Sequence, residues 1–349
     1  MSRRRARIAF AAVVVGLAVT ALPLKRLRYL AMPVVHDPST SSSIPCMTVD
    51  DDEARAAERA RVPGRVSALL PRADGSLLIG TFDHGLWRLD RAAGSVPVEI
   101  GALDGRERFI DALAEWRGHV VAGTHRGAIL LSADGARAGV LAAGQAVSSL
   151  AVTDGELLIG TAHGIWRGGG DAGAGDAPLG ERGPDGETLR VTALAVARDR
   201  VFIGTPDGVY TIAAPPAAGA VAVWHPLVFG SPGASSNVVT ALAPFGDGVL
   251  AGTDDGGTVF VSMSAIAARP FADARANDVN PGALARVAGG VFVGTEGAGL
   301  IAVDDARRHA RRLGGTAGAR ISAVSAAASQ LWFGSEEGAL YTVAASRIF

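Results

Sequence analysis

Short apolar runs that end in a Gly-Thr or Gly-Ser step recur along the chain. They read LLIGT at 77–81, VVAGT at 120–124, LLIGT at 157–161, VFIGT at 201–205, VLAGT at 249–253, VFVGT at 291–295 and LWFGS at 331–335. A run of this length with almost no polar interruption is typical of a strand that is covered on both faces. The pattern therefore predicts seven buried strands, one in each copy of a repeat.

The spacing of these steps supports an internal repeat of about 40 residues. Their glycines are Gly80, Gly123, Gly160, Gly204, Gly252, Gly294 and Gly334. An apolar residue stands 11 positions before the first glycine and 10 positions before each of the others; these residues are Leu69, Leu113, Leu150, Leu194, Leu242, Leu284 and Val324. A fixed offset in seven copies indicates one structural unit used seven times.

Each unit contains the pattern of a small antiparallel sheet. A strand such as VSALL alternates apolar and small polar residues, an Asp/Gly turn leads into the Gly-Thr strand, and a second turn ending in Gly leads to a third strand such as GLWRLD. A weaker fourth strand follows in most copies, for example VPVEI at 96–100. Four strands in about 42 residues match a propeller blade, whereas solenoids need a helix or much shorter rungs. We predict an all-β fold, a seven-bladed β-propeller of four-stranded antiparallel blades over residues 64–349.

The N-terminal 30 residues carry a targeting pattern. Four arginines precede a run of 17 apolar-rich residues at 8–24, and Lys25, Arg26 and Arg28 follow it. Such a helix is about 25 Å long, between a signal-peptide core and a full membrane span. The basic residues that follow disfavour cleavage. We expect a hydrophobic helix that acts as an uncleaved signal or single-pass anchor, with an inner-membrane-anchored or secreted propeller on the extracytoplasmic side.

Residues 31–63 are predicted to be a linker. Its first part is rich in Pro, Ser and Thr, and the charged stretch VDDDEARAAERARVPG favours a short surface helix. The last unit leaves little room for a fourth strand, and an open sheet edge invites misassociation. We therefore expect residues 44–49 or 60–62 to supply the missing outer strand.

Composition excludes several classes of function. Lys and Arg number 33 against 34 Asp and Glu, which gives no basic excess for nucleic-acid binding. The single cysteine, Cys46, cannot form an internal disulfide. A Walker loop and a dinucleotide fingerprint are both missing from the sequence, so the Gly-Thr turns are not phosphate cradles. Their glycines are expected to allow close packing within a sheet, and their threonines to hydrogen-bond the turn.

The units LLIGTFDHGLWRLD and LWFGSEEGALYTV resemble the two-component regulator propeller repeat, a WD40/YVTN-like repeat family found in extracytoplasmic sensor regions of bacterial hybrid histidine kinases. The resemblance covers residues 64–345 and implies a propeller with a sensing or binding role. The chain departs from the family pattern because only Trp332 keeps the tryptophan of the Gly-Thr strand, and no kinase or receiver region follows the last unit. A free-standing binding propeller therefore fits better than a kinase sensor.

The turns between the second and third strands lie on the rim where propellers commonly bind ligands. Candidate binding residues on these turns are His84, His125, His163, Asp207, Asp254, Asp255, Glu296, Glu336 and Glu337. Neighbouring turns are expected to be too far apart to share one metal ion, so no metal or other cofactor is predicted. In the first turn, Phe82, Asp83 and His84 face either a ligand or only water. The loop at 101–109 adds Arg106, Arg108 and Phe109 as a contact patch, and longer loops at 168–190, 229–237 and 273–282 are further places for specificity.

The innermost strands carry too little chemistry for an enzyme. Their polar positions are hydroxyl residues except for Asp111, and the full set is Ser67, Asp111, Ser148, Ser149, Thr192, Thr240 and Ser322. One carboxylate does not make a glycosidase, and a ring of hydroxyls suits a water-filled channel or a polar ligand. The sequence favours a monomeric binding, sensor or scaffold module that meets a protein or polysaccharide on the rim and the membrane through its N-terminal helix. The alternative is a lactonase-like or lyase-like enzyme with a metal in the central channel.

Overall fold

The computed structural model describes residues 46–169, 176–183, 186–225, 237–307, 309–327 and 330–348. The expected N-terminal hydrophobic helix lies outside the described residues. Within the described ranges, no helix has the length and apolar character needed to cross a membrane.

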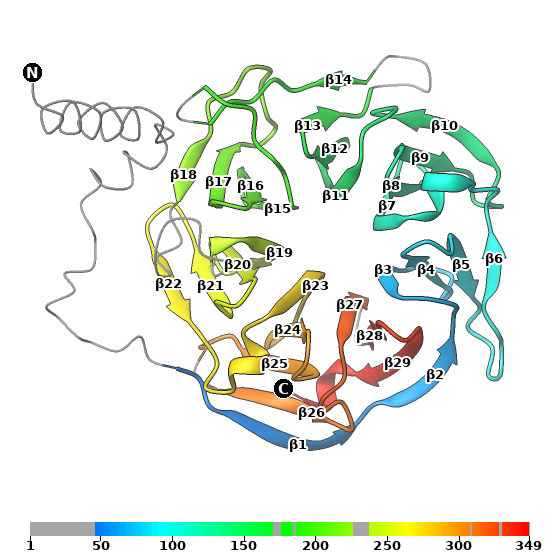
Figure 1. Cartoon of the computed structure of the whole chain (residues 1–349), viewed down its shortest axis with the longest axis vertical. Helices are drawn as coiled ribbons and strands as arrows, with labels where there is room; N and C mark the ends of the chain where they lie inside the picture. The colour runs from blue at the N-terminus through cyan, green and yellow to red at the C-terminus, as the bar shows by residue number, and fades with distance from the viewer. Residues whose placement is uncertain are drawn as a thin grey trace, which may run out of the picture. The chain divides into compact units, whose positions relative to one another are not determined.

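The described strands form seven sheets arranged as a ring, which confirms the seven-bladed propeller (Figure 1). Blade 1 contains β3 (Val66–Pro71), β4 (Leu77–Thr81), β5 (Leu86–Leu89) and β6 (Val98–Ile100). Blade 2 contains β7 (Ile110–Trp116), β8 (His119–Thr124), β9 (Gly127–Leu131) and β10 (Arg137–Leu141). Blade 3 contains β11 (Val147–Thr153), β12 (Glu156–Thr161), β13 (Gly164–Arg167) and β14 (Ala177–Pro178). Blade 4 contains β15 (Ala193–Ala197), β16 (Arg200–Thr205), β17 (Gly208–Ala213) and β18 (Val223–His225).

The remaining blades follow the same order. Blade 5 contains β19 (Val239–Phe245), β20 (Gly248–Thr253), β21 (Thr258–Val261) and β22 (Ile266–Arg269). Blade 6 contains β23 (Val279–Val287), β24 (Gly290–Thr295), β25 (Leu300–Asp304) and β26 (Ala310–Gly314), and blade 7 contains β27 (Ile321–Ala327), β28 (Gln330–Ser335) and β29 (Ala339–Ala344). The named helices of the described residues are the short 3-10 turns η1 (Gly105–Arg108), η3 (Ala274–Ala276) and η4 (Ala345–Arg347).

Consecutive strands within each blade pair antiparallel, with the first strand nearest the centre of the ring (Figure 1). The Gly-Thr strands are buried along most of their length, as the apolar runs predict. Thr81 Oγ1 donates to the carbonyl of Gly85 at 2.7 Å, and the threonines of blades 2–6 make the same bond to their turn glycines. Gly85 has a φ of 79°, a left-handed conformation that favours glycine at the end of the turn.

The glycine of each Gly-Thr step lies against the next blade. A Cβ atom at any of the seven glycines would fall within 2.7 Å of a Val or Ile at or just before the start of the following first strand. The pairs are Gly80 with Ile110, Gly123 with Val147, Gly160 with Val191, Gly204 with Val239, Gly252 with Val279, Gly294 with Ile321, and Gly334 with Val66. The expectation of close packing within one sheet is therefore corrected: the tightest contact crosses the seam between blades.

Hydrogen bonds reinforce the same seams. Thr192 Oγ1 donates to the carbonyl of Val239 at 2.6 Å, and Ser322 Oγ donates to that of Val66 at 2.6 Å. The equivalent donors in blades 1, 3 and 6 are Ser67 to Ile110, Ser148 to Val191 and Asn280 to Ile321. In these five seams the residue that packs on a glycine also accepts a hydrogen bond from the same preceding blade.

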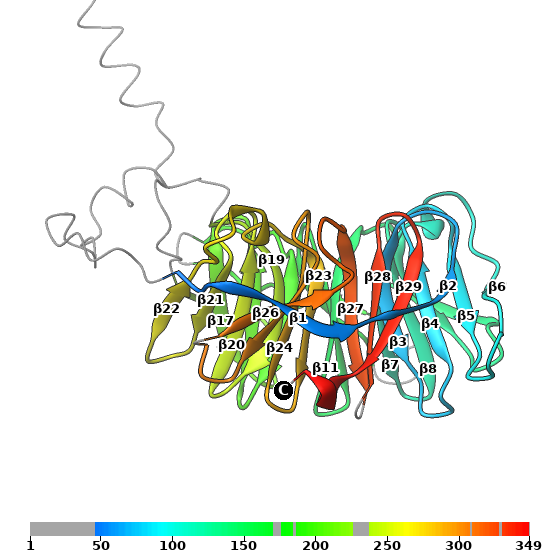
Figure 2. The ribbon, with the colours of Figure 1, turned by 90° about the horizontal axis from the view of Figure 1, so that it is seen from below.

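Two strands before the first blade close the ring. β2 (Ala57–Arg61) pairs antiparallel with β29 as the outer strand of blade 7, and β1 (Val49–Arg55) pairs parallel with β26 as a fifth strand of blade 6. Figure 2 shows both strands running along the outside of the ring. The surface helix expected in this charged stretch is wrong, because pairing with open sheet edges outweighs local helix propensity.

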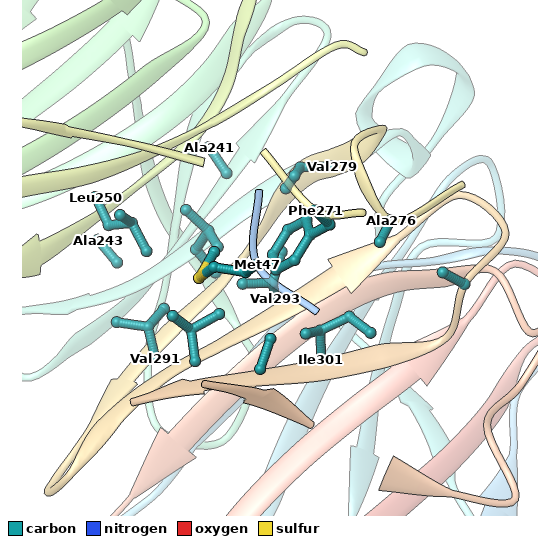
Figure 3. Packing of buried hydrophobic residues seen from close by; sticks show 14 of the residues in the cluster. Met47, Ala241, Ala243, Leu250, Phe271, Ala276, Val279, Val291, Val293 and Ile301 are labelled. Atoms are coloured by element: carbon teal, nitrogen blue, oxygen red, sulfur yellow. The ribbon is translucent and has the colours of Figure 1, made fainter. Parts of the chain in front are cut away.

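The beginning of this strap, residues 46–61, is anchored by Met47. Its backbone bridges to Phe271, and its side chain is 2% exposed. Figure 3 shows Met47 among Phe271, Ala276, Val279 and other apolar side chains of blades 5 and 6. The strap therefore holds the outer edges of two blades and adds to the core beside a third.

A methyl group at a seam glycine should destabilise the whole ring. In Gly204→Ala the new Cβ would lie 2.6 Å from Val239 Cγ1, and overpacking of this kind costs about 1–3 kcal/mol. Gly297→Ala is the matched control, because a Cβ there meets no atom within 4 Å. We expect urea unfolding to show a lower midpoint for Gly204→Ala and an unchanged one for Gly297→Ala. Equal midpoints would contradict the seam contact.

Candidate functional site

A cavity of about 600 Å³ occupies the centre of the ring on the side of the Gly-Thr turns. The first strands of several blades line it with Ser67, Asp111, Ser148, Ser149, Thr192 and Thr240. Arg65, Phe82 and Arg190 contribute from positions beside the strand starts. The polar inner-strand positions named from the sequence therefore face this cavity, with the exception of Ser322, whose hydroxyl is bound in the seam.

An aromatic cluster stands at the cavity's edge, between blades 1 and 2. The rings of Phe109 and His125 are stacked with centroids 5.0 Å apart, and Phe82 meets Phe109 edge-on at 5.0 Å. Phe82 lines the cavity and is 40% exposed. His125 Nε2 lies 2.9 Å from Asp111 Oδ2. The rim turns of two blades, one loop residue and one channel residue thus form a single site, the Phe82 cluster (Phe82, Phe109, His125, Asp111).

Asp111 departs from the seam pattern of its neighbours. It occupies the position at which Ser67, Ser148, Thr192 and Ser322 donate to the next blade, but its carboxylate is bound to His125 instead. Burial raises the pKa of Asp111, and the nearby His125 and Arg65 oppose that rise. A hydroxyl at this position would be expected to add a hydrogen bond across the seam, which the Asp111 carboxylate does not provide.

The three rim histidines do not come together. His84 contacts its neighbour Asp83, His125 contacts Asp111, and His163 Nδ1 lies 3.0 Å from the side chain of Gln145. No group of three His, Cys, Asp or Glu side chains within the described ranges is placed to hold a metal ion.

The acidic turn residues form a partly compensated arc on blades 5–7. Arg320 bridges Glu296 and Glu336 at 2.9 and 3.0 Å, and Arg65 adds a longer contact of 3.5 Å to Glu336. Burial raises the pKa of Asp278, and the charges of Asp254, Glu296 and Asp255 raise it further. Of the other two predicted acids, Asp207 is half-buried in its turn and Glu337 is exposed. Negative charge therefore concentrates on one side of the face.

The three residues of the contact patch predicted in the loop at 101–109 have different surroundings in the structure. Arg108 is tied down, with donor contacts to the carbonyls of Asp83 and His84 and an ion pair of 3.2 Å to Glu99. Arg106 is exposed on η1, while Phe109 enters the Phe82 cluster. The loop at 229–237 lies outside the described residues except for Asn237.

A buried carboxyl lies beneath the turn of blade 3. Glu181 is 1% exposed and accepts a hydrogen bond from the backbone N–H of Ile165 at 2.7 Å. Burial raises its pKa to about 7, against the opposing effects of that hydrogen bond and of Arg182. The sequence around Glu181 gives no sign of its burial, because its loop carries no apolar pattern.

Three further site residues were missed or left open. Arg190 precedes an ordinary first strand, and Asp278 lies in a loop named only by its range. Phe82 stood in a turn whose direction the sequence left undecided. A large aromatic in a turn where the other copies carry Pro, Ala or charged residues was the available signal.

Comparisons with known proteins show the fold but no family. No family model matches the chain, and no curated protein matches it. Among solved structures, the designed Ika8 protein is 17% identical with a TM-score of 0.57, covering 83% of this chain and 99% of its own. A catalytically inactive virginiamycin B lyase from Staphylococcus aureus with quinupristin is 9% identical with a TM-score of 0.68, covering 84% and 99%.

A third neighbour bears on the resemblance drawn from the repeat. The extracellular domain of the hybrid two-component system BT4673 from B. thetaiotaomicron is 16% identical with a TM-score of 0.62. The match covers 82% of this chain and 39% of that one. The resemblance to two-component propellers is thus confirmed in the architecture, and at this identity it extends to the fold alone.

Replacing Asp111 by serine should stabilise the ring. In Asp111→Ser the new hydroxyl can donate to Val147 as Ser67 does to Ile110, and a partly desolvated carboxylate is removed. One such hydrogen bond contributes about 1 kcal/mol, or a few degrees in Tm. Calorimetry should show a higher Tm for Asp111→Ser and no change for Asp104→Ser, an exposed control. A lower Tm would mean that the bond to His125 outweighs the seam.

The raised pKa of Glu181 predicts a pH-dependent stability. The folded chain retains this proton up to about pH 7, whereas the unfolded chain releases it near 4.5. Its contribution is therefore fully present below pH 4.5 and is lost as pH rises through 7, by roughly 1–3 kcal/mol. Glu181→Gln keeps an acceptor for Ile165 and should flatten this part of the curve in urea titrations from pH 4 to 8. An unchanged slope would exclude Glu181 as its source.

Proposed function

We propose that the chain is an extracytoplasmic, membrane-tethered binding module that engages a protein or polysaccharide partner on the face of the Gly-Thr turns. The observation that carries this proposal is the Phe82 cluster. Exposed aromatic side chains backed by a rigid scaffold are typical contact centres, since they bury a large area at a small cost in conformational entropy. The seams on both sides fix the blades that present the cluster.

Charge on the same face supports recognition of a specific partner. Arg106, Arg126 and Arg190 form no ion pair with other described residues and belong to the side of blades 2–4. Asp254, Asp255 and Asp278 crowd together on blades 5 and 6. A face with opposite charges on its two sides orients a complementary partner and excludes others.

Two further observations support an extracytoplasmic location and a sensing role for this chain. The sequence predicts an anchor in the first 30 residues, and one structural neighbour is named as an extracellular domain of a two-component system. We extend the proposal to a role in sensing or scaffolding without catalysis. Asp111 is the one carboxylate among the residues that line the central cavity, and acid–base chemistry on a glycosidic bond requires a pair.

Removal of the exposed ring should weaken partner binding. We expect Phe82→Ala to reduce recovery of a cross-linked partner from native membranes about tenfold, as for a central contact residue. Val98→Ala is the control, because Val98 is 59% exposed on the outer strand of blade 1, away from the cavity. The same variants are applied to a glycan array for the polysaccharide arm. Equal losses in both variants, or no protein or glycan retained by the wild type, would refute the proposal.

A further inference from the structure

The wall of the central cavity offers little hydrogen bonding to a ligand. Ser67, Ser148 and Thr192 line the cavity, yet each hydroxyl donates to a backbone carbonyl of the next blade. Ser149 also lines it, and its Oγ accepts the N–H of Leu194 at 2.9 Å. The ring of hydroxyls expected to suit a polar ligand is therefore largely engaged by the protein itself. A sugar placed here would exchange its bonds to water for few bonds to protein.

Below this level the cavity is apolar. Six of the seven residues that stand 10 or 11 positions before the Gly-Thr glycines line it. They are Leu69, Leu113, Leu150, Leu194, Leu242 and Val324. They occupy the same register position on each first strand, so their side chains share one direction relative to the blade. The inner part of the cavity thus favours a hydrocarbon body.

The mouth of the cavity favours an anion. Its charged lining residues are Arg65, Arg190 and Asp111. Asp111 is held by His125, and Arg65 has a 3.5 Å contact to Glu336. Arg190 is exposed and has no ion-pair partner among the described residues. An anionic group at this level would meet the exposed guanidinium of Arg190.

We propose that the central cavity binds an amphipathic carboxylate, whose hydrocarbon body enters the leucine-lined part and whose carboxylate meets Arg190 at the mouth. A volume of about 600 Å³ lies within the usual range for small-molecule sites. The ligand is a different molecule from the rim partner of the proposed function, although Phe82 and Asp111 of the Phe82 cluster also line the cavity.

Isothermal titration of the full chain with decanoate tests this assignment. We expect saturable binding with one site per chain, and much weaker binding of decanol, which lacks the charge, and of glucuronate, which lacks the hydrocarbon body. Arg190→Ala should weaken decanoate binding about tenfold, since a charge-assisted hydrogen bond is lost. Arg106→Ala is the matched control, because Arg106 is exposed on the same face but does not line the cavity.

The apolar contribution has its own variant. Leu150→Asn places an amide among the leucines of the cavity and should weaken decanoate binding. The control variant Arg106→Ala should bind decanoate as the wild type does. Circular dichroism confirms that each variant is folded before titration. Absence of saturable decanoate binding, tighter binding of glucuronate, or equal effects of Arg190→Ala and Arg106→Ala would each overturn the proposal. Loss of decanoate binding in Leu150→Asn with unchanged recovery of the rim partner would show that the two sites are distinct.

Discussion

The contact between successive blades is the constraint on which the rest of the structure depends. A Val or Ile at or just before the start of each first strand packs on a glycine of the preceding blade. In five seams the carbonyl of that same residue also accepts a side-chain hydrogen bond. Packing fixes the separation of two blades and the hydrogen bond fixes their register. The need for glycine at these seams accounts for the repeated Gly-Thr or Gly-Ser step in the sequence.

Because every seam joins only neighbours, the ring needs a separate means of holding its ends together. Val66 meets Gly334 and accepts from Ser322, so the last seam repeats the others. The strap then pairs β2 with β29 and β1 with β26 and buries Met47 beside Phe271. A closed ring also leaves fewer exposed edges for misassociation.

The sequence was sufficient for the ring because its information is local and repeated seven times. The closing outer strand expected at 60–62 overlaps β2. β1 was missed, because the charged run at 50–53 has no alternation typical of a strand and its partners lie some 260 residues away. The candidate site was only partly accessible. The two-residue period of a strand places Ser67 and Asp111 at equivalent positions near the centre. It does not reveal that the Ser67 hydroxyl donates a hydrogen bond to the next blade whereas Asp111 is bound to His125. Phe82, Phe109 and His125 come together because a turn, a loop and a second turn converge in space.

Two seams lack the side-chain hydrogen bond, and this irregularity bears on where recognition can arise. Asp111 is turned to His125, and Thr240 Oγ1 is buried without a hydrogen-bond partner in the described structure. Both residues line the cavity, in blades 2 and 5. Elsewhere the inner polar groups are fixed by the ring and cannot change without loosening it. At these two positions the inner strand does not tie its seam with a side-chain hydrogen bond, and natural proteins tend to accept such local losses of stability at functional sites. Polar recognition in the cavity is accordingly expected at its mouth, where Arg190 is exposed.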